Sequence, residues 1–136
     1  MSFESAAPRL EKLGIGGGSS FWETVRGNLS RFDEAARWWR VVSEAIAPAL
    51  SAADLEICKS AAATLPPEPW GDATWEKANW DAFVDKLKRS TGKSGRALFH
   101  PLRIALTGEE RGPELRALLP FIGRARAAAR LQGERA

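Results

Sequence analysis

The sequence has few of the residue types on which most enzyme and metal sites depend. Its 136 residues include one cysteine, one histidine and no tyrosine. A lone cysteine excludes a disulfide within the chain and is typical of a reducing compartment. Cys58 and His100 do not supply the ligand set of a zinc site, and His100 stands beside no nucleophile motif of a Ser/His/Asp triad. We therefore expect this chain to contain no catalytic residue, no metal and no cofactor.

Long apolar runs and targeting signals are also missing. Hydrophobic residues make up 44% of the chain, yet no run approaches the roughly 18 residues of a membrane span. The N-terminus lacks the basic-then-apolar pattern of a secretory signal. These absences predict a cytoplasmic protein without a membrane partner. The length of 136 residues is enough for one compact domain or two small subdomains.

Two glycine-containing loops do not have the features of a phosphate-binding loop. Residues 16–19 read Gly-Gly-Gly-Ser, without the lysine and the preceding strand that such a loop requires. Residues 92–94 read Gly-Lys-Ser, but a helix pattern precedes them and Leu87 stands where the first glycine belongs. Nucleotide binding is therefore not expected at either loop.

The charge is distributed unevenly along the chain. Residues 1–85 carry 8 Lys or Arg and 13 Asp or Glu, a net charge of −5, whereas residues 86–136 carry 12 and 4, a net charge of +8. A basic half on an otherwise acidic chain indicates a polyanionic partner. The alternative is a solvated arginine-rich surface, and charge alone does not separate tRNA from DNA or an acidic membrane.

Helix signals occur throughout, and sustained strand alternation is absent. We expect helices over residues 4–13, 21–29, 30–47, 51–64, 74–90, 96–106, from 113 onward, and 123–131. The sequence therefore predicts an all-α fold of two small helical bundles packed end to end. A proline-rich connector at residues 65–73 would separate an N-terminal helical subdomain, 1–64, from a basic C-terminal subdomain, 74–136.

Local signals predict where two of the helices begin. Ser20 and Glu23 have the spacing of a capping box, which places a helix start at Ser20. Pro113 follows Gly112 and suits the first helical position, because proline lacks the N–H that would be unbonded there.

The apolar pattern predicts several core residues. Cys58 shares a helical stripe with Leu55, Ala62 and Leu65, which indicates a small buried thiol. The stripe of the third helix consists of Phe32, Ala35, Ala36, Trp39, Val42 and Ile46. We also expect Trp75 and Trp80 in the core, and leave Trp22 and Trp70 open between core and surface.

Residues 91–119 contain the most distinctive order of motifs. Thr91-Gly92 and Gly95-Arg96 precede Pro101-Leu102-Arg103, and Thr107-Gly108 leads through a loop to Gly112-Pro113-Glu114-Leu115. This order resembles the C-terminal anticodon-binding region of bacterial glutamyl-tRNA synthetase, a class I enzyme. Looser matches at Phe21-Trp22, Val25-Arg26, Asn28-Leu29 and Trp38-Trp39 extend the resemblance over nearly the whole chain.

The resemblance implies a tRNA-binding module that recognises the anticodon stem-loop of glutamate tRNA. The parent activity would be ATP-dependent attachment of glutamate to tRNA by a catalytic domain, whose His-Ile-Gly-His-type and Lys-Met-Ser-Lys-Ser-type motifs are absent here. ATP and magnesium would belong to that domain, which would also be a partner of this monomeric module. Met1 would then mark a fragment boundary, or the chain would be a truncated paralogue acting alone.

The resemblance also implies a set of anticodon-binding residues. The arginine of the Pro-Leu-Arg motif, here Arg103, contacts an anticodon base in the family, and the alternative is an ion pair with Glu109 or Glu110. The family pocket for anticodon bases is lined by the residues that match Gly112, Pro113 and Leu115. Their alternative is a plain helix start, with Leu115 in the core.

A second anticodon-facing stretch matches Arg26 and Asn28. Some members of the family have Arg or Gln in place of Asn28, whose shorter side chain has no charge and could also simply end a helix. Candidates for contacts with the tRNA backbone are Lys86, Lys88, Lys93, Arg96, Arg111 and Arg116. Such contacts position RNA without reading its sequence.

Two alternatives of other kinds stay open at this stage. A helical protein-interaction module would have an apolar groove in place of an exposed basic face. A general RNA- or DNA-binding bundle would bind unrelated stem-loops as well as glutamate tRNA.

Overall fold

The computed structural model describes residues 2–47, 49–66 and 77–136, and the regular elements in these ranges are all helices. In chain order they are α1 (Phe3–Lys12), α2 (Gly18–Val25), the 3₁₀ helix η1 (Arg26–Asn28), α3 (Glu34–Ser43), α4 (Ala52–Thr64), α5 (Lys77–Thr91), α6 (Arg96–Thr107), α7 (Leu115–Ile122) and α8 (Arg124–Leu131). The all-α prediction is confirmed. In the described ranges, no helix has the length and apolar character needed to cross a membrane.

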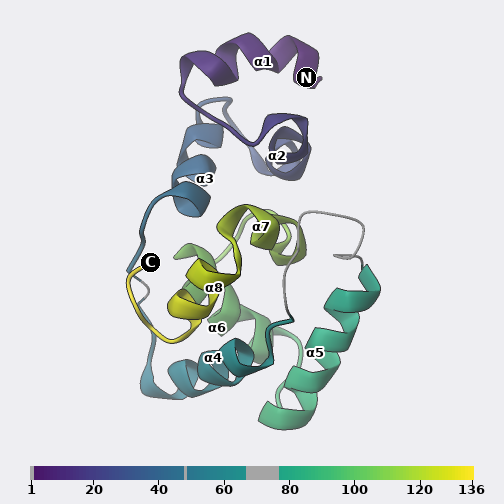
Figure 1. The fold of residues 1–136 in the computed structure, drawn as a ribbon, viewed down its shortest axis with the longest axis vertical. Coiled ribbons are helices and arrows are strands. Elements are labelled where there is room, and N and C mark those ends of the chain that lie inside the picture. The colour runs from purple at the N-terminus through teal and green to yellow at the C-terminus, as the bar shows by residue number, and fades with distance from the viewer. Residues whose placement is uncertain (1, 48, 67–76) are drawn as a thin grey trace.

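The helices form two groups along the long axis of the molecule (Figure 1). Helices α1, α2 and α3 lie at one end and α4, α5, α6 and α8 at the other, while α7 packs against α2 and α3 as well as α8. Helix α4 packs on α5, α6 and α8, so residues 52–64 lie with the helices that follow them. Residues 67–76 lie outside the described residues, so the subdomain boundary expected at 65–73 stays a prediction.

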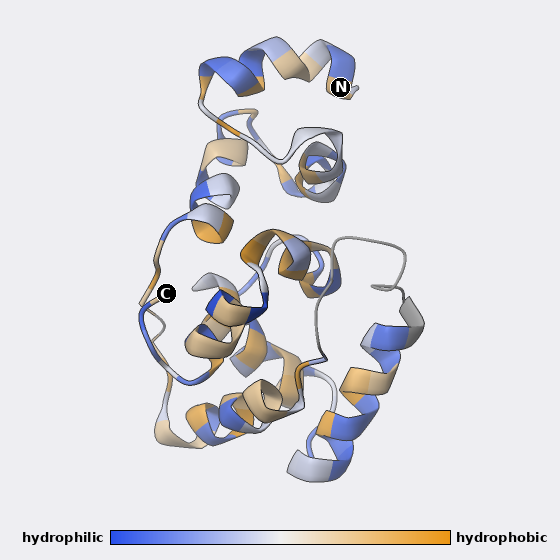
Figure 2. Cartoon of the chain, viewed as in Figure 1, coloured by the Kyte–Doolittle hydropathy of each residue, from blue (hydrophilic) through white to orange (hydrophobic). Residues whose placement is uncertain are grey.

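In the group formed by α4, α5, α6 and α8, each helix turns an apolar face inward. Figure 2 shows both hydrophilic and hydrophobic residues along these helices. On α6 the buried side chains of Leu98, Leu102 and Ala105 recur at helical spacing, and Phe83 and Leu87 do the same on α5. The backbone therefore places the opposite faces of α5 and α6 at the surface.

Cys58 lies in this core, as the apolar stripe predicted. Its side chain is fully buried, and its sulfur lies 3.4 Å from the carbonyl oxygen of Pro101 on α6. Burial, together with the nearby Asp54 carboxylate, raises the pKa of the thiol to about 12.

We expect the Cys58 thiol to be inert in the folded chain. Because the thiolate is the reactive form, a pKa of about 12 reduces its population at pH 8 on the order of a thousand-fold relative to an ordinary cysteine. Labelling by a disulfide reagent should be slow in buffer and complete within minutes in guanidinium. Equal labelling rates in the two conditions would contradict the burial.

Three predicted helix starts are wrong. Helix α3 begins at Glu34 instead of residue 30, and the other two errors have local causes. Helix α2 begins at Gly18, ahead of Ser20, because Gly17 adopts a left-handed φ of 83° and its carbonyl accepts from the N–H of Phe21. Helix α7 begins at Leu115, behind Pro113. The carbonyl of Pro113 accepts from Arg103, while Glu114 accepts the first helical bonds, from Ala117 and Leu118.

The apolar stripe predicted Trp39 as the core tryptophan of α3, but Trp38 is the buried one. Trp38 is 5% exposed, while Trp39 is partly buried and meets Phe21 edge-on, with ring centroids 5.2 Å apart. Trp22 is buried as well, at 3% exposure. Trp80 is partly buried, and Trp70 and Trp75 lie outside the described residues.

Three arginines near the chain end bond to backbone carbonyls of other helices. Arg124 donates to the carbonyls of Leu65 and Pro66, after the end of α4, and Arg126 donates to that of Val42 in the last turn of α3. Carbonyls in the last turn of a helix lie beyond the reach of its own N–H groups, and guanidinium donors suit the negative end of a helix dipole.

Arg130 makes the largest set of such bonds. Its side chain is fully buried and donates to carbonyls in three segments at distances of 2.7–2.9 Å, those of Val41, Glu44, Leu106 and Ala136. Burial and the nearby Arg126 lower its pKa to about 10, which leaves it charged at neutral pH. Part of the +8 charge of the C-terminal segment is therefore internal.

Candidate nucleic-acid interface

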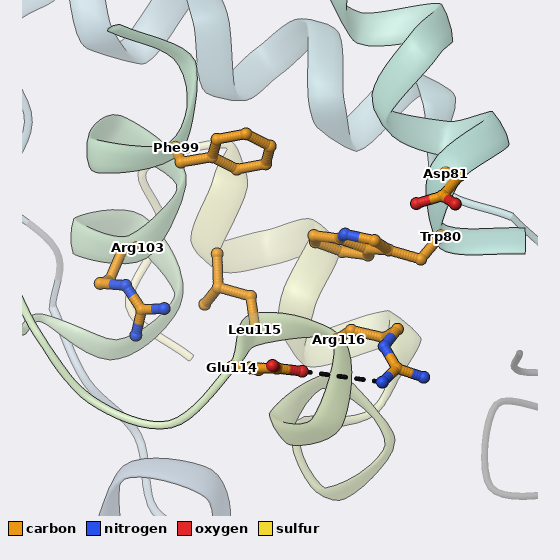
Figure 3. Close-up of a pocket in the computed structure, with 7 residues that line it drawn as sticks. All are labelled: Trp80, Asp81, Phe99, Arg103, Glu114, Leu115 and Arg116. Atoms are coloured by element: carbon orange, nitrogen blue, oxygen red, sulfur yellow. Dashed lines mark ion pairs between the residues drawn. The ribbon is translucent and has the colours of Figure 1, made fainter. Parts of the chain in front are cut away.

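A hollow of about 350 Å³ opens where α5, α6 and the start of α7 meet (Figure 3). We call it the aromatic hollow. Its lining residues are Trp80, Asp81, Phe99, Arg103, Glu114, Leu115 and Arg116. Three of them, Arg103, Leu115 and Arg116, were predicted as site residues from the sequence, and folding brings them together from α6 and α7.

Arg103 is held in place at the edge of this hollow. Its Nη1 donates to the carbonyl oxygen of Pro113 at 2.9 Å, and its half-buried position lowers the pKa of the guanidinium. Within the described residues, Nε and Nη2 have no hydrogen-bond partner. One arm of the guanidinium is thus anchored to the backbone, and the other donors stay available to a ligand.

The other walls of the hollow combine apolar surface with carboxylates. Trp80 reaches from α5 toward Leu115, and Phe99 projects from α6 on the opposite side (Figure 3). The carboxylate of Glu114 lies 3.6 Å from the guanidinium of Arg116, and both side chains are partly exposed. Aromatic faces stack on unpaired bases, while guanidinium and carboxylate groups bond to base edges. The hollow therefore has the groups needed to hold a splayed-out base.

A second hollow, of about 440 Å³, lies where residues 108–112 meet α3 and η1. We call it the loop hollow. Its lining residues are Asn28, Glu34, Arg37, Trp38, Gly108, Glu109, Glu110, Arg111 and Gly112. Three predicted residues, Asn28, Arg111 and Gly112, meet here, although Asn28 is more than 80 positions from the others in the sequence.

The carboxylates of this loop have partners other than Arg103. Glu109 forms an ion pair with Arg37 of α3, which raises the pKa of that guanidinium. Glu110 lies 3.5 Å from Nε2 of His100. The alternative that Arg103 pairs with Glu109 or Glu110 is therefore wrong, and its partner in the free chain is the Pro113 carbonyl.

The segment 108–114 contributes to both hollows, with residues 108–112 in the loop hollow and Glu114 in the aromatic hollow. Gly112 lies so close beneath Trp38 that a Cβ at this position would stand 2.2 Å from the indole Cη2. Pro113 is fully buried and Leu115 is 4% exposed. Pro113 therefore lines neither hollow, while Gly112 lines the loop hollow and Arg103 and Leu115 line the aromatic hollow.

The remaining predicted residues lie apart from the two hollows. Arg26 is exposed beside Asn28, and its Nη1 lies 3.2 Å from the Glu23 carboxylate. The exposed predicted cations on α5, the following loop and the first turn of α6 are Lys86, Lys88, Lys93 and Arg96. None of these four, which we call the basic edge, lines either hollow.

Sequence reasoning missed four residues of the aromatic hollow. Phe99 stands four positions before Arg103 on α6, a spacing that places both side chains on one helix face and could have been noticed. Trp80 was expected in the core. Glu114 lies inside the motif at residues 112–115 but was not named as a site residue. Asp81 had no signal, because it becomes part of the hollow only when α5 packs beside α6.

Comparison with known proteins identifies relatives of the chain. The model of the anticodon binding domain family matches residues 29–134. Glutamate–tRNA ligase 2 of Xanthobacter autotrophicus is 56% identical over 133 residues, which cover 98% of this chain and 28% of that protein. Glutamate–tRNA ligase 1 of Parvibaculum lavamentivorans is 51% identical with the same coverage. The chain thus spans less than a third of the length of these relatives, and no solved structure matches it significantly.

Proposed function

The chain belongs to the anticodon-binding domain family, and from this premise we propose that it binds the anticodon stem-loop of glutamate tRNA as a monomeric part of a glutamate–tRNA ligase. The activity of the parent enzyme, attachment of glutamate to tRNA with ATP and magnesium, would belong to another part of that protein. The relatives at 51–56% identity, which are glutamate–tRNA ligases by name, support this assignment.

The observation that carries the proposal is the aromatic hollow beside Arg103. Unpaired bases are recognised by stacking and by bonds to their edges, and the hollow provides Trp80 and Phe99 for the first and Arg103 for the second. Because the Pro113 carbonyl fixes one nitrogen of Arg103, little side-chain freedom would be lost on binding.

The loop hollow supports recognition of a neighbouring nucleotide. Asn28 offers both a donor and an acceptor, and Arg111 is exposed at the same hollow. The basic edge at Lys86, Lys88, Lys93 and Arg96 would contact phosphates of the stem, since cations there are exposed and such contacts need no defined pocket.

Replacing Arg103 by alanine tests the proposal. We expect a loss of about 1–3 kcal/mol in binding of glutamate tRNA, because a base-edge contact would be removed. With a tRNA whose anticodon has been replaced, the loss should approach zero, since the contact is already absent there. Lys88→Ala, which removes an exposed cation of the basic edge, should weaken both tRNAs equally.

Two measurements make the outcome decisive. Fluorescence anisotropy gives the affinities for the two tRNAs, and thermal melting of Arg103→Ala reports the loss of its bond to the Pro113 carbonyl, expected at about 1–2 kcal/mol. Equal losses of affinity on both tRNAs would reduce Arg103 to a backbone contact or a structural residue.

A further inference from the structure

A third hollow, of about 470 Å³, lies at the end of α1 where it meets the segment before α3. We call it the α1 hollow. Its lining residues are Arg9, Lys12, Leu13, Arg31, Phe32 and Asp33. None of them belongs to the two hollows described above, and α1 precedes the residues matched by the family model, 29–134.

The α1 hollow has an apolar floor. The guanidinium carbon of Arg9 lies 4.0 Å from the centre of the Phe32 ring, and Phe32 in turn packs against the buried Trp22, with centroids 5.4 Å apart. Leu13 is 46% exposed and is the large hydrophobic side chain that the described residues leave most open to solvent. Arg9 is thus stacked in place beside an apolar surface that folding leaves uncovered.

The rim of the hollow is positively charged in a part of the chain that is otherwise acidic. Arg9, Lys12 and Arg31 face a single carboxylate, Asp33, which lies 3.5 Å from Nε of Arg31. This local excess of two positive charges stands within residues 1–85, whose net charge is −5. Lys12 is exposed and has no partner among the described residues, so its charge is available to an anion.

Consecutive residues of the chain line the α1 hollow and the loop hollow. Asp33 lines the first and Glu34 lines the second, and consecutive Cα atoms are about 3.8 Å apart. Asn28 of the loop hollow stands three positions before Arg31. The same segment, residues 28–37, therefore connects the two.

We propose that the α1 hollow is a further RNA-contact site, which holds the sugar–phosphate backbone of the bound tRNA where it leaves the anticodon bases. The inference rests on the proposed function. Arg9, Lys12 and Arg31 bind phosphates, and Leu13 packs against a ribose or an unpaired base. An acidic protein segment would also match the charge, but continuity with the loop hollow favours the RNA.

Charge substitutions at Lys12 test this site with the intact chain. Lys12→Ala should lower the slope of log K against log salt by about one, and Lys12→Glu should weaken tRNA binding about three- to ten-fold at low salt. Because the contact reads no base, both losses should be equal for glutamate tRNA and for the tRNA with a replaced anticodon. Lys59→Ala and Lys59→Glu are the matched controls, since Lys59 is exposed on α4 beside a different hollow.

The outcomes separate this inference from the proposed function. If Lys12 variants bind as tightly as Lys59 variants while Arg103→Ala still discriminates between the tRNAs, the α1 hollow is not an RNA site and the proposed function stands. If the unaltered chain binds no tRNA at low salt, both are overturned. A loss confined to glutamate tRNA would also contradict the inference, because it would indicate base reading at α1.

Discussion

Replacing Arg130 by methionine is expected to lower the free energy of unfolding by about 3–5 kcal/mol, the largest effect we predict for a single substitution. Methionine keeps much of the volume but removes every donor. The carbonyls of Val41 and Leu106 would then lose this partner in the interior, and those of Glu44 and Ala136 would lose it in partly buried positions. A buried acceptor without a hydrogen bond costs about 1–3 kcal/mol.

A lysine at the same position separates charge from hydrogen-bond geometry. Arg130→Lys keeps the positive charge near the ends of α3 and α6, but one ammonium group cannot reach carbonyls in three segments. Arg130→Lys should therefore lower the free energy of unfolding by less than Arg130→Met does. Arg135→Ala is the control, since Arg135 is exposed in the same part of the chain.

Urea unfolding at neutral pH measures these differences. The loss for Arg130→Met should appear as a lower midpoint with an unchanged slope, because the surface exposed on unfolding stays the same. A loss of less than about 1 kcal/mol would show that the carbonyls find other partners, and that Arg130 does not connect α3, α6 and the last residues.

Replacing Gly112 by alanine is expected to cost about 3 kcal/mol of stability. The added Cβ would lie 2.2 Å from Cη2 and 2.5 Å from Cζ2 of Trp38, and the indole is 5% exposed, with little room to move. Overpacking of this kind typically costs about 1–3 kcal/mol, and the closeness of two ring atoms favours the upper end.

Gly27→Ala is the matched control for Gly112→Ala. A Cβ at Gly27 meets nothing within 4 Å, and Gly27 has no positive φ. Its substitution should be neutral, or stabilising by about 0.4–1 kcal/mol through the unfolded state. Thermal melting of the two variants, and of Gly112→Ala combined with Trp38→Leu, checks the cause. If the smaller side chain at position 38 recovers no stability for Gly112→Ala, the clash with the indole is not the reason.

The position of Gly112 connects stability with recognition. Residues 108–114 contribute to both the aromatic hollow and the loop hollow, and Trp38 holds this segment from the α3 side. The bond from Arg103 to the Pro113 carbonyl holds it from the α6 side. Displacing the segment should therefore alter both hollows, so Gly112→Ala should also weaken tRNA binding.

The sequence by itself determined the helical class of this protein, most helix positions and the family to which it belongs. Those features depend on local order. Ser51 caps α4 by accepting from the N–H of Asp54 three residues later, and Gly108 ends α6 with a left-handed φ of 73°. Helical spacing also placed Cys58 in the core. Where a positive φ or a side-chain bond intervened, as at Gly17 and Pro113, the predicted helix start was displaced by three residues for α2 and by two for α7.

Tertiary structure alone decided which arginines are available to a ligand. Arg130 and the exposed Arg135 stand five positions apart at the end of an Ala- and Arg-rich segment, and no local pattern separates them. Arg130 is buried because the ends of α3 and α6, 86 and 24 residues away along the chain, converge on it with unpaired carbonyls. Tertiary structure also decided the aromatic hollow, because Trp80 comes from α5, Arg103 from α6 and Glu114 from the residue before α7. Local sequence encodes the helices, but the donors and acceptors at their ends acquire partners only when the helices pack together.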